Sequence, residues 1–336
     1  MTERSPAPLR VGILALDGVM LSSVAGPSDA LRVAGKLASI RDPINPVQFE
    51  SAVVSARGQS EVQTSAGISI GGLQGPREDL DVLIVPGLMH ECPSGLTQQL
   101  AAYTPEYEYL HNLHRRGTII AATCSGTFMF AASGLLDGHR ATTSWWLASS
   151  FRSRFPRVTL EADQMMVKDG PLVTTGAATS IYNYILELVA EHGGEDLAQQ
   201  TGRMLVIDRE RQSQAPYVSL AMMERPRHSL SERAERYLQR ELHQEMTVAK
   251  LAEHCGISER SLLRHYRSHH GMTPLEHIQH LRVERAKALL ETTHLSFEEI
   301  VERCGYSDVS SFRKLFKRAS ATTPSDYRER FRLRAH

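Results

Sequence analysis

The sequence is poor in cysteine and has no long apolar run. Only four of its 336 residues are cysteines, and no two of them form a CxxC pair. This scarcity argues against a disulfide framework or a zinc module and favours a reducing compartment. The first residues lack the apolar region of an export signal, and the longest uncharged stretch, 118–136, carries Ser, Thr and Gly at turn positions. We therefore expect a cytoplasmic protein with no membrane segment, metal or cofactor.

The chain also has no net charge, with 38 Lys and Arg against 38 Asp and Glu. The charge is nevertheless distributed unevenly. From Arg227 onward there are 20 basic and 15 acidic residues, and before it there are 18 and 23. This asymmetry predicts an anionic partner for the C-terminal part alone, although such a surplus is also common on a solvated helical face.

Residues 9–207 alternate strand-like apolar runs with amphipathic helical runs. DVLIV (81–85) and TIIAAT (118–123) are apolar along almost their whole length, as strands buried on both faces are. GPSDALRVAGKLA (26–38) is one of the helical runs between strands, which are typical of crossovers in a parallel sheet. We expect a three-layer α/β domain, followed by an aperiodic linker at 208–228.

Residues 229–330 are helical in pattern and contain an internal repeat. LAEHCGISERSLLRHYRSHHGMTP (251–274) recurs as IVERCGYSDVSSFRKLFKRASATTP (300–324), with one residue inserted. In each copy a short helix ends at Cys-Gly, where glycine supplies a left-handed turn residue. A serine, Ser258 or Ser307, then caps the next helix. The repeat predicts two helix-turn-helix motifs.

The second helix of each copy has an apolar face and a basic face. Leu262 and Tyr266, like Phe312 and Phe316, lie four residues apart and are expected to pack inward. The opposite faces suit insertion into the major groove of double-stranded DNA. The candidate DNA-contacting residues are Arg260, Leu263, Arg264, Arg267, Ser310, Arg313, Lys314, Lys317 and Arg318. The alternative is a helical interaction module with solvated basic faces.

Together with the closing TTPSDYRER (322–330), the repeat resembles the AraC-family DNA-binding domain. The resemblance implies that six of the candidates face bases, namely Arg260, Leu263, Arg264, Ser310, Arg313 and Lys314. It implies that Arg267, Lys317 and Arg318 face phosphates, which position a protein without specifying sequence. Arg264 is the strongest candidate for a guanine contact, and Leu263 for a thymine methyl.

Cys124 lies in AATCSGTFMF (121–130), between a strand-like run and a helix that opens with Gly126. This pattern resembles a nucleophile elbow, a sharp strand-to-helix turn that presents one side chain at the carboxyl edge of a sheet. The helix N-terminus is expected to lower the pKa of the thiol. We therefore consider chemistry at this turn.

With VPGLMHE (85–91) and SGLLDGHRATTSWW (133–146), the first domain resembles the PfpI-like branch of the class I glutamine amidotransferase-like superfamily, as fused to AraC domains in GlxA-type regulators. The resemblance implies a flavodoxin-like sandwich, often dimeric, with a ligand pocket around the cysteine. It also implies activation of catabolic operons, often for amino acids or quaternary ammonium compounds.

The sequence departs from the enzymes of that superfamily, which combine the elbow cysteine with a carboxylate and a histidine. Ser22 and Ser23 stand where the acid is expected, Ser125 follows the cysteine, and Ser144 stands where many relatives have histidine. Cys124 lacks its usual base, so we predict no catalytic residue.

Ligand binding is the function that we predict for the first domain. The free backbone N–H groups expected at Gly87, at Leu88 and in the elbow could hold a small polar or zwitterionic effector, together with hydroxyls and an indole ring at the sheet edge. The candidate ligand-binding residues are Gly87, Leu88, Cys124, Ser125, Ser144, Trp145 and Thr175.

The whole chain is thus expected to be a homodimeric transcriptional activator that a small metabolite controls. Three other interpretations of the first domain stay open. The first is a cysteine-dependent hydrolase or amidase, in which His90 or Asp17 acts as the base. The others are a redox sensor that uses Cys124 and Cys92, and a purely structural dimerisation domain.

Overall fold

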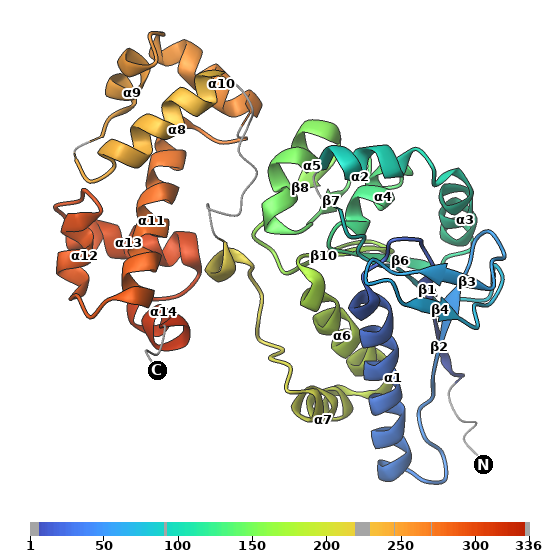
Figure 1. The fold of residues 1–336 in the computed structure, drawn as a ribbon. Coiled ribbons are helices and arrows are strands. Elements are labelled where there is room, and N and C mark those ends of the chain that lie inside the picture. The colour runs from blue at the N-terminus through green and yellow to red at the C-terminus, as the bar shows by residue number, and fades with distance from the viewer. Residues whose placement is uncertain (1–6, 91–92, 219–228, 245, 270, 333–336) are drawn as a thin grey trace. The chain divides into compact units, whose positions relative to one another are not determined.

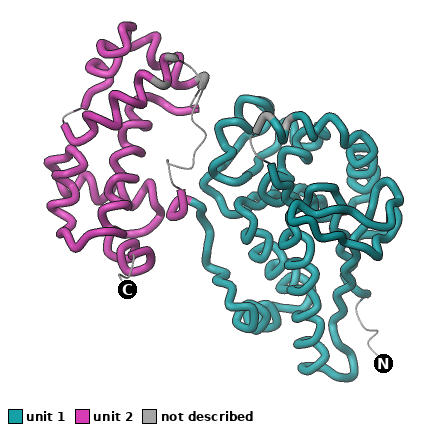
Figure 2. Tube along the Cα trace, in the orientation of Figure 1, with its two compact units in different colours: residues 1–214 teal, residues 215–336 magenta. Residues whose placement is uncertain are grey.

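The computed structural model describes residues 7–90, 93–218, 229–244, 246–269 and 271–332. The chain splits into two compact units, residues 1–214 and 215–336 (Figure 2). Unit 1 is α/β and the second unit is helical, as the two sequence patterns predict. No helix in the described part of the chain is long and apolar enough to cross a membrane.

Unit 1 is built on a six-stranded sheet with the strand order β2-β1-β5-β6-β10-β9. Its strands run parallel except that β9 is antiparallel to β10. The five parallel strands follow the flavodoxin-like order, which confirms the predicted fold. The sheet strands are β1 (Leu9–Leu14), β2 (Phe49–Val54), β5 (Val82–Val85), β6 (Ile119–Thr123), β9 (Met166–Asp169) and β10 (Leu172–Thr175). Two small sheets pair β3 (Glu61–Gln63) with β4 (Ser69–Gly71) and β7 (Arg140–Ala141) with β8 (Thr159–Leu160).

Helices cover both faces of the large sheet (Figure 1). Helices α1, α6 and α7 pack together on one side, and α3 and α4 contact β6 on the other. The helices of unit 1 are α1 (Leu21–Arg41), α2 (Pro93–Leu100), α3 (Thr104–Arg115), α4 (Gly126–Ala132), α5 (Ala148–Arg154), α6 (Ile181–Gly193) and α7 (Glu195–Leu205). This arrangement is the predicted three-layer sandwich.

Helix α1 begins at Leu21, before the predicted helical run at 26–38, so Pro27 lies inside it. Local Gly-Pro chemistry favours a helix start at this place, and tertiary packing overrides that preference. Gly26 permits the packing, because a Cβ atom there would lie 2.3 Å from the hydroxyl of Tyr182 on α6.

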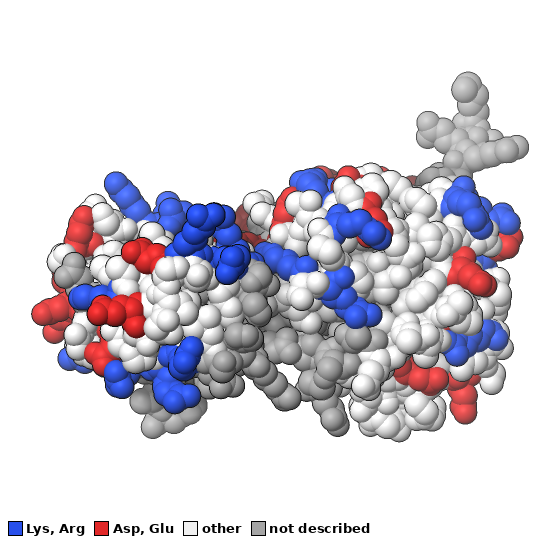
Figure 3. Space-filling model, turned by 90° about the horizontal axis from the view of Figure 1, so that it is seen from above, with Lys and Arg blue, Asp and Glu red and all other residues white. Residues whose placement is uncertain are grey.

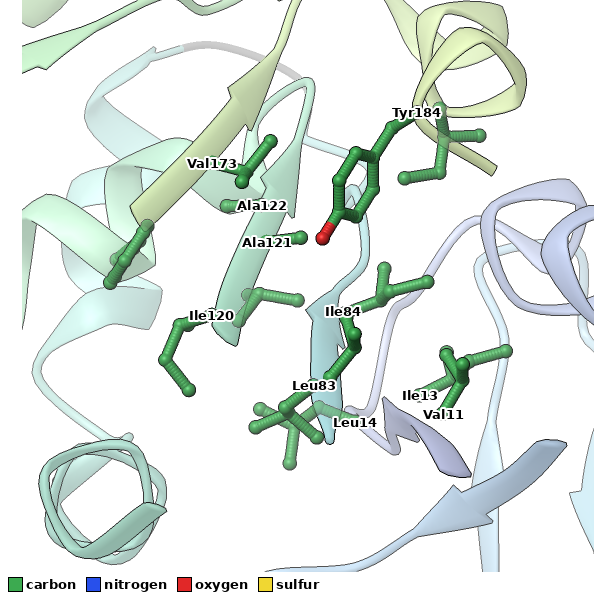
Figure 4. Packing of buried hydrophobic residues seen from close by; sticks show 14 of the residues in the cluster. Val11, Ile13, Leu14, Leu83, Ile84, Ile120, Ala121, Ala122, Val173 and Tyr184 are labelled. Atoms are coloured by element: carbon green, nitrogen blue, oxygen red, sulfur yellow. The ribbon is translucent and has the colours of Figure 1, made fainter. Parts of the chain in front are cut away.

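The core of unit 1 lies between the sheet and its helices (Figure 4). Tyr184 reaches from α6 toward Ala121 and Ile84, and its buried hydroxyl has no hydrogen-bond partner in the described part of the chain. Tyr109 on α3 is also buried, but its hydroxyl donates to the carbonyl oxygen of Arg77 at 2.6 Å. The two tyrosines therefore differ in whether burial of the hydroxyl is compensated.

The second unit contains two helix-turn-helix motifs that share the long helix α11. One core lies around α8, α9, α10 and the first half of α11, and a second lies around the other half of α11 with α12, α13 and α14. Leu262, Tyr266, Phe312 and Phe316 are buried in these cores, as predicted. The helices are α8 (Ser229–Glu241), α9 (Val248–His254), α10 (Glu259–His269), α11 (Pro274–Thr292), α12 (Phe297–Arg303), α13 (Val309–Ser320) and α14 (Pro324–Phe331).

The turns of both motifs contain the glycine that the repeat predicts, but the residues that cap the following helices do not correspond. Gly256 and Gly305 have φ angles of 68° and 75°, the left-handed region predicted for them. Ser258 caps α10, since its Oγ accepts from the N–H of Ser261 at 3.2 Å. The prediction of Ser307 as the second cap is wrong. Asp308 caps α13 instead, because the inserted residue moves the start of that helix by one position.

The two buried tyrosines generate a stability prediction. Tyr109→Phe should lower the free energy of unfolding by about 1 kcal/mol, because it leaves the carbonyl oxygen of Arg77 without its donor. Tyr184→Phe removes an uncompensated hydroxyl, so it should be neutral within about 0.5 kcal/mol or stabilising. Urea unfolding of both variants measures the difference. An equal loss in the two variants would show that the Tyr184 hydroxyl has a partner.

Candidate ligand site and nucleic-acid interface

Cys124 occupies a strained turn between β6 and α4. Its φ angle is 57°, a left-handed conformation that few residues other than glycine adopt. Gly126 opens α4 against the loop after β5, where a Cβ atom would lie 2.4 Å from the carbonyl oxygen of Pro86. The predicted elbow geometry is confirmed by this pair of observations.

Three neighbouring loops hold the turn in place. The N–H of Cys124 points between the carbonyl oxygens of Gly176 and Thr175, at 2.9 and 3.1 Å. The Cys124 carbonyl oxygen accepts from Oγ1 of Thr143 at 2.9 Å. Thr143 precedes the short 3-10 turn Trp145–Leu147, so the segments after β6, β7 and β10 meet at the elbow.

The Cys124 thiol is enclosed and protonated rather than activated. The residue is 4% exposed, and the hydroxyl of Ser144 donates to its Sγ at 3.0 Å. Burial raises the pKa of the thiol, and hydrogen bonds from Ser144 and Ser125 only partly oppose that effect. The expected lowering of this pKa by the helix N-terminus is wrong, because desolvation outweighs the influence of a helix of seven residues.

The two substitute bases have other partners. Asp17 is exposed, and its Oδ1 accepts from the N–H of Gln63 at 3.0 Å. Nδ1 of His90 faces the carbonyl oxygen of Leu88 at 3.3 Å. Within the described residues, the groups that hydrogen-bond to the thiol of Cys124 are hydroxyl and amide groups. Cys92, the second cysteine of the redox interpretation, lies outside the described residues.

The structure brings most of the predicted ligand residues together at the carboxyl edge of the sheet. Gly87 lies against Cys124, since a Cβ atom on the glycine would be 3.2 Å from the cysteine Cβ. Ser125 Oγ accepts from the N–H of Leu88 at 2.8 Å and donates to its carbonyl oxygen at 2.6 Å. The prediction of a free N–H at Leu88 is therefore wrong.

Trp145 is buried beside Ser144, and its ring meets that of Trp146 edge to face, with the centroids 5.2 Å apart. This contact fits core packing rather than the ligand contact predicted for the indole.

Several buried hydroxyls at the same edge have no hydrogen-bond partner within the described ranges. Thr175 Oγ1, predicted as a ligand group, is one of them, and Thr123 Oγ1 and Thr127 Oγ1 are two others that the sequence analysis missed. Thr123 and Thr175 are register partners on adjacent strands, so their side chains lie on the same face of the sheet. Thr123 and Thr127 both lie in the elbow motif at 121–130, and this position could have identified them as candidate ligand residues.

Within the described residues, no group of three His, Cys, Asp or Glu side chains is arranged to hold a metal ion.

The predicted DNA-contacting residues lie on α10 and α13, away from the buried faces. All nine are exposed except Leu263, which is half-buried. Arg313 and Arg318 have partners within the unit. The Arg313 guanidinium lies 4.9 Å from the ring centroid of Phe297, and Arg318 donates to Gln279 at 3.4 Å. On the face shown in Figure 3, Lys and Arg side chains lie among Asp and Glu. The prediction of a DNA interface therefore rests on the helix faces rather than on overall charge.

Comparison with known proteins matches each unit separately. A model described as "Helix-turn-helix domain" matches residues 251–330, and one described as "DJ-1/PfpI family" matches residues 9–191. The chain belongs to the DJ-1/PfpI family. This DJ-1/PfpI domain is joined to an AraC-type helix-turn-helix region, as the two resemblances in the sequence predict.

Relatives named as HTH-type transcriptional regulators align with most of the chain. The HTH-type transcriptional regulator CdhR of Pseudomonas aeruginosa is 30% identical over 71% of each chain. The HTH-type transcriptional regulator GlxA of Rhizobium meliloti is 29% identical over 96% of each. A crystal structure of a protein from Vibrio parahaemolyticus, 23% identical, matches 59% of this chain and all of its own with a TM-score of 0.51. This last similarity shows the DJ-1/PfpI fold alone.

The raised pKa of Cys124 predicts how alkylation depends on pH. The thiolate is a minor species near neutral pH, so the rate of reaction with iodoacetamide should rise about tenfold per pH unit from about pH 6 to 8. Ser144→Ala removes a hydrogen bond that favours the thiolate and should slow the reaction further. Peptide mass spectrometry measures the rate at Cys124. A rate that is constant over this interval would indicate an activated thiolate.

The helix faces predict different effects for two basic residues. Arg264→Ala should relax sequence preference and lose about 1–3 kcal/mol of discrimination at one base pair. Lys317→Ala should weaken binding to all sequences alike and reduce the salt slope by about one. Fluorescence anisotropy with specific and scrambled duplexes at several salt concentrations separates the two. Equal behaviour of the two variants would contradict the assigned faces.

Proposed function

We propose that the chain is a sequence-specific DNA-binding transcriptional regulator whose unit 1 binds a small effector without converting it. The observation that supports this proposal most directly is the state of Cys124. Its thiol is buried, has a raised pKa and accepts a hydrogen bond from the side chain of Ser144. A thiol nucleophile needs a base within about 3 Å. A hydroxyl in that place holds the thiol without taking its proton.

The chemistry of the elbow supports a polar effector. Thr123, Thr127 and Thr175 carry buried hydroxyls that have no hydrogen-bond partner among the residues that the structure describes. Such groups cost free energy unless a ligand or a water satisfies them, and each hydroxyl can both donate and accept. An amino acid or a quaternary ammonium compound, as the GlxA-type resemblance implies, is the class of effector that we propose.

Regulation requires that the effector bind the DNA-competent arrangement better than the alternative one. We propose that the regulator acts as a homodimeric activator in the cytoplasm. The exposed basic faces of α10 and α13 support the DNA-binding half of this proposal.

One observation favours a second candidate function, a cysteine-dependent hydrolase or amidase. The left-handed conformation of Cys124 is the strained geometry in which related folds present a nucleophile. Such an enzyme requires a base to reach the buried thiol when its substrate binds.

A Cys124→Ala variant separates the two candidates. A thermal-shift screen of L-amino acids and betaines first identifies a binding compound, and a reporter gene then measures the transcriptional response to it. For a non-catalytic site, Cys124→Ala should retain the response within about twofold. Thr175→Val, which removes one free hydroxyl, should weaken binding about tenfold.

Loss of the response in Cys124→Ala with binding intact would support the enzyme instead. A screen in which no compound shifts the unfolding of the wild-type chain would favour a purely structural unit.

A further inference from the structure

Residues 212–214, inside the expected linker, are docked against the elbow. The side chain of Gln214 is 1% exposed. Its Nε2 donates toward the carbonyl oxygens of Thr143, Gln164 and Ala162 at 2.9 to 3.0 Å. Its Oε1 accepts from the N–H of Ala177 at 3.0 Å. The side-chain amide of Gln214 therefore binds the segment that contains Thr143 and Ser144, and these two residues hydrogen-bond to Cys124.

The side chain of Gln214 also packs against Gly176, which is hydrogen-bonded to the backbone of Cys124. A Cβ atom on Gly176 would be 2.3 Å from the Gln214 side chain, and the Gly176 carbonyl oxygen accepts the N–H of Cys124. Backbone bonds fasten the rest of the segment, since Met165 donates to Gln212 at 2.9 Å and Gln214 donates to Asp163 at 2.8 Å. Gln214 therefore packs against the segments that hold Cys124 in place.

The next residues along the chain are docked within the second unit. Lys287 of α11 is 3% exposed, and its Nζ donates to the carbonyl oxygens of Ala215 and Val218, both at 3.1 Å. Arg330 of α14 donates to the hydroxyl of Tyr217 at 2.6 Å. The 3-10 turn Ala215–Tyr217 also packs beside α13, which carries the second basic face.

We propose that residues 212–218 couple the ligand site to the second helix-turn-helix motif, with Gln214 as the positioning residue at one end and Lys287 as the anchor at the other. The proposal rests on the proposed function, because the signal that it carries is effector binding. Gln214 and Ala215 are successive residues, so no free residue separates the two sets of contacts. A change at either end is therefore passed to the other through one peptide bond.

The side chains of Gln214 and Lys287 are each expected to be either fully docked or released. An undocked Gln214 would withdraw one donor from the buried carbonyl oxygen of Thr143 and from the partly buried carbonyl oxygens of Ala162 and Gln164, and partly satisfied networks of this kind are costly. The same holds for the ammonium of Lys287, which also pairs with Glu284 at 2.8 Å. An effector that moves Thr143 or Gly176 therefore changes the docking of the segment rather than bending it gradually.

Hydrogen exchange of the full-length protein without effector tests the coupling. Gln214→Ala should accelerate exchange about tenfold or more at residues 212–214 and also at 215–218. Lys287→Met should accelerate it at 215–218 and α13 and also at 212–214. Mass spectrometry with electron-transfer fragmentation resolves these segments.

Gln212→Ala and Lys250→Met are matched controls, because both original side chains are exposed. They should leave all these segments unchanged. The proposal is overturned if the effect of each test variant stops at the bond between Gln214 and Ala215. Since no effector is present, that result leaves the thermal-shift test of the proposed function untouched, and the two failures can be told apart.

Discussion

The close approach of helix α4 to the loop after β5 is the constraint on which the candidate ligand site depends. Gly126 has no side chain, so α4 can lie against the carbonyl oxygens of Val85 and Pro86. Cys124 must then take a left-handed conformation to join β6 to the helix. The thiol is thereby placed at the carboxyl edge of the sheet, where the loops after neighbouring parallel strands meet.

What surrounds the thiol decides what this geometry can do. In the nucleophile elbows of enzymes the turn exposes a side chain to a base, whereas here burial raises the pKa of Cys124 and the hydroxyl that contacts its thiol, that of Ser144, only partly opposes this effect. Hydroxyls from two strands and one helix lie in or next to the strained turn, those of Thr123 in β6, Thr175 in β10 and Thr127 in α4. Recognition of a small polar molecule needs this convergence and no activated thiol.

Periodicity and repeats made the architecture predictable from the sequence. The uninterrupted apolar run at Val82–Val85 indicates a strand buried on both faces, and that strand lies in the middle of the sheet. The repeat around Gly256 and Gly305 likewise indicates two turns with positive φ angles. Both signals are local, so a single sequence carries them.

The remaining features depend on residues distant along the chain. Gln214 reaches Thr143 over a separation of 71 residues, and nothing near Gln214 in the sequence indicates that its amide is buried. The pKa of Cys124 was misjudged for the same reason, since its burial comes from surrounding loops. The cap of α13 was misplaced by one residue, because a repeat with an insertion leaves the position of the inserted residue open.

The central claim is that unit 1 senses a molecule without converting it. Its most direct test measures two quantities in one sample, the affinity of the full-length protein for its operator and the chemical identity of an effector found in the amino-acid and betaine screen. The account predicts that the effector changes the operator affinity and is recovered intact by mass spectrometry after prolonged incubation. Recovery of a hydrolysed or otherwise converted product, formed by the wild type and absent with Cys124→Ala, would contradict it.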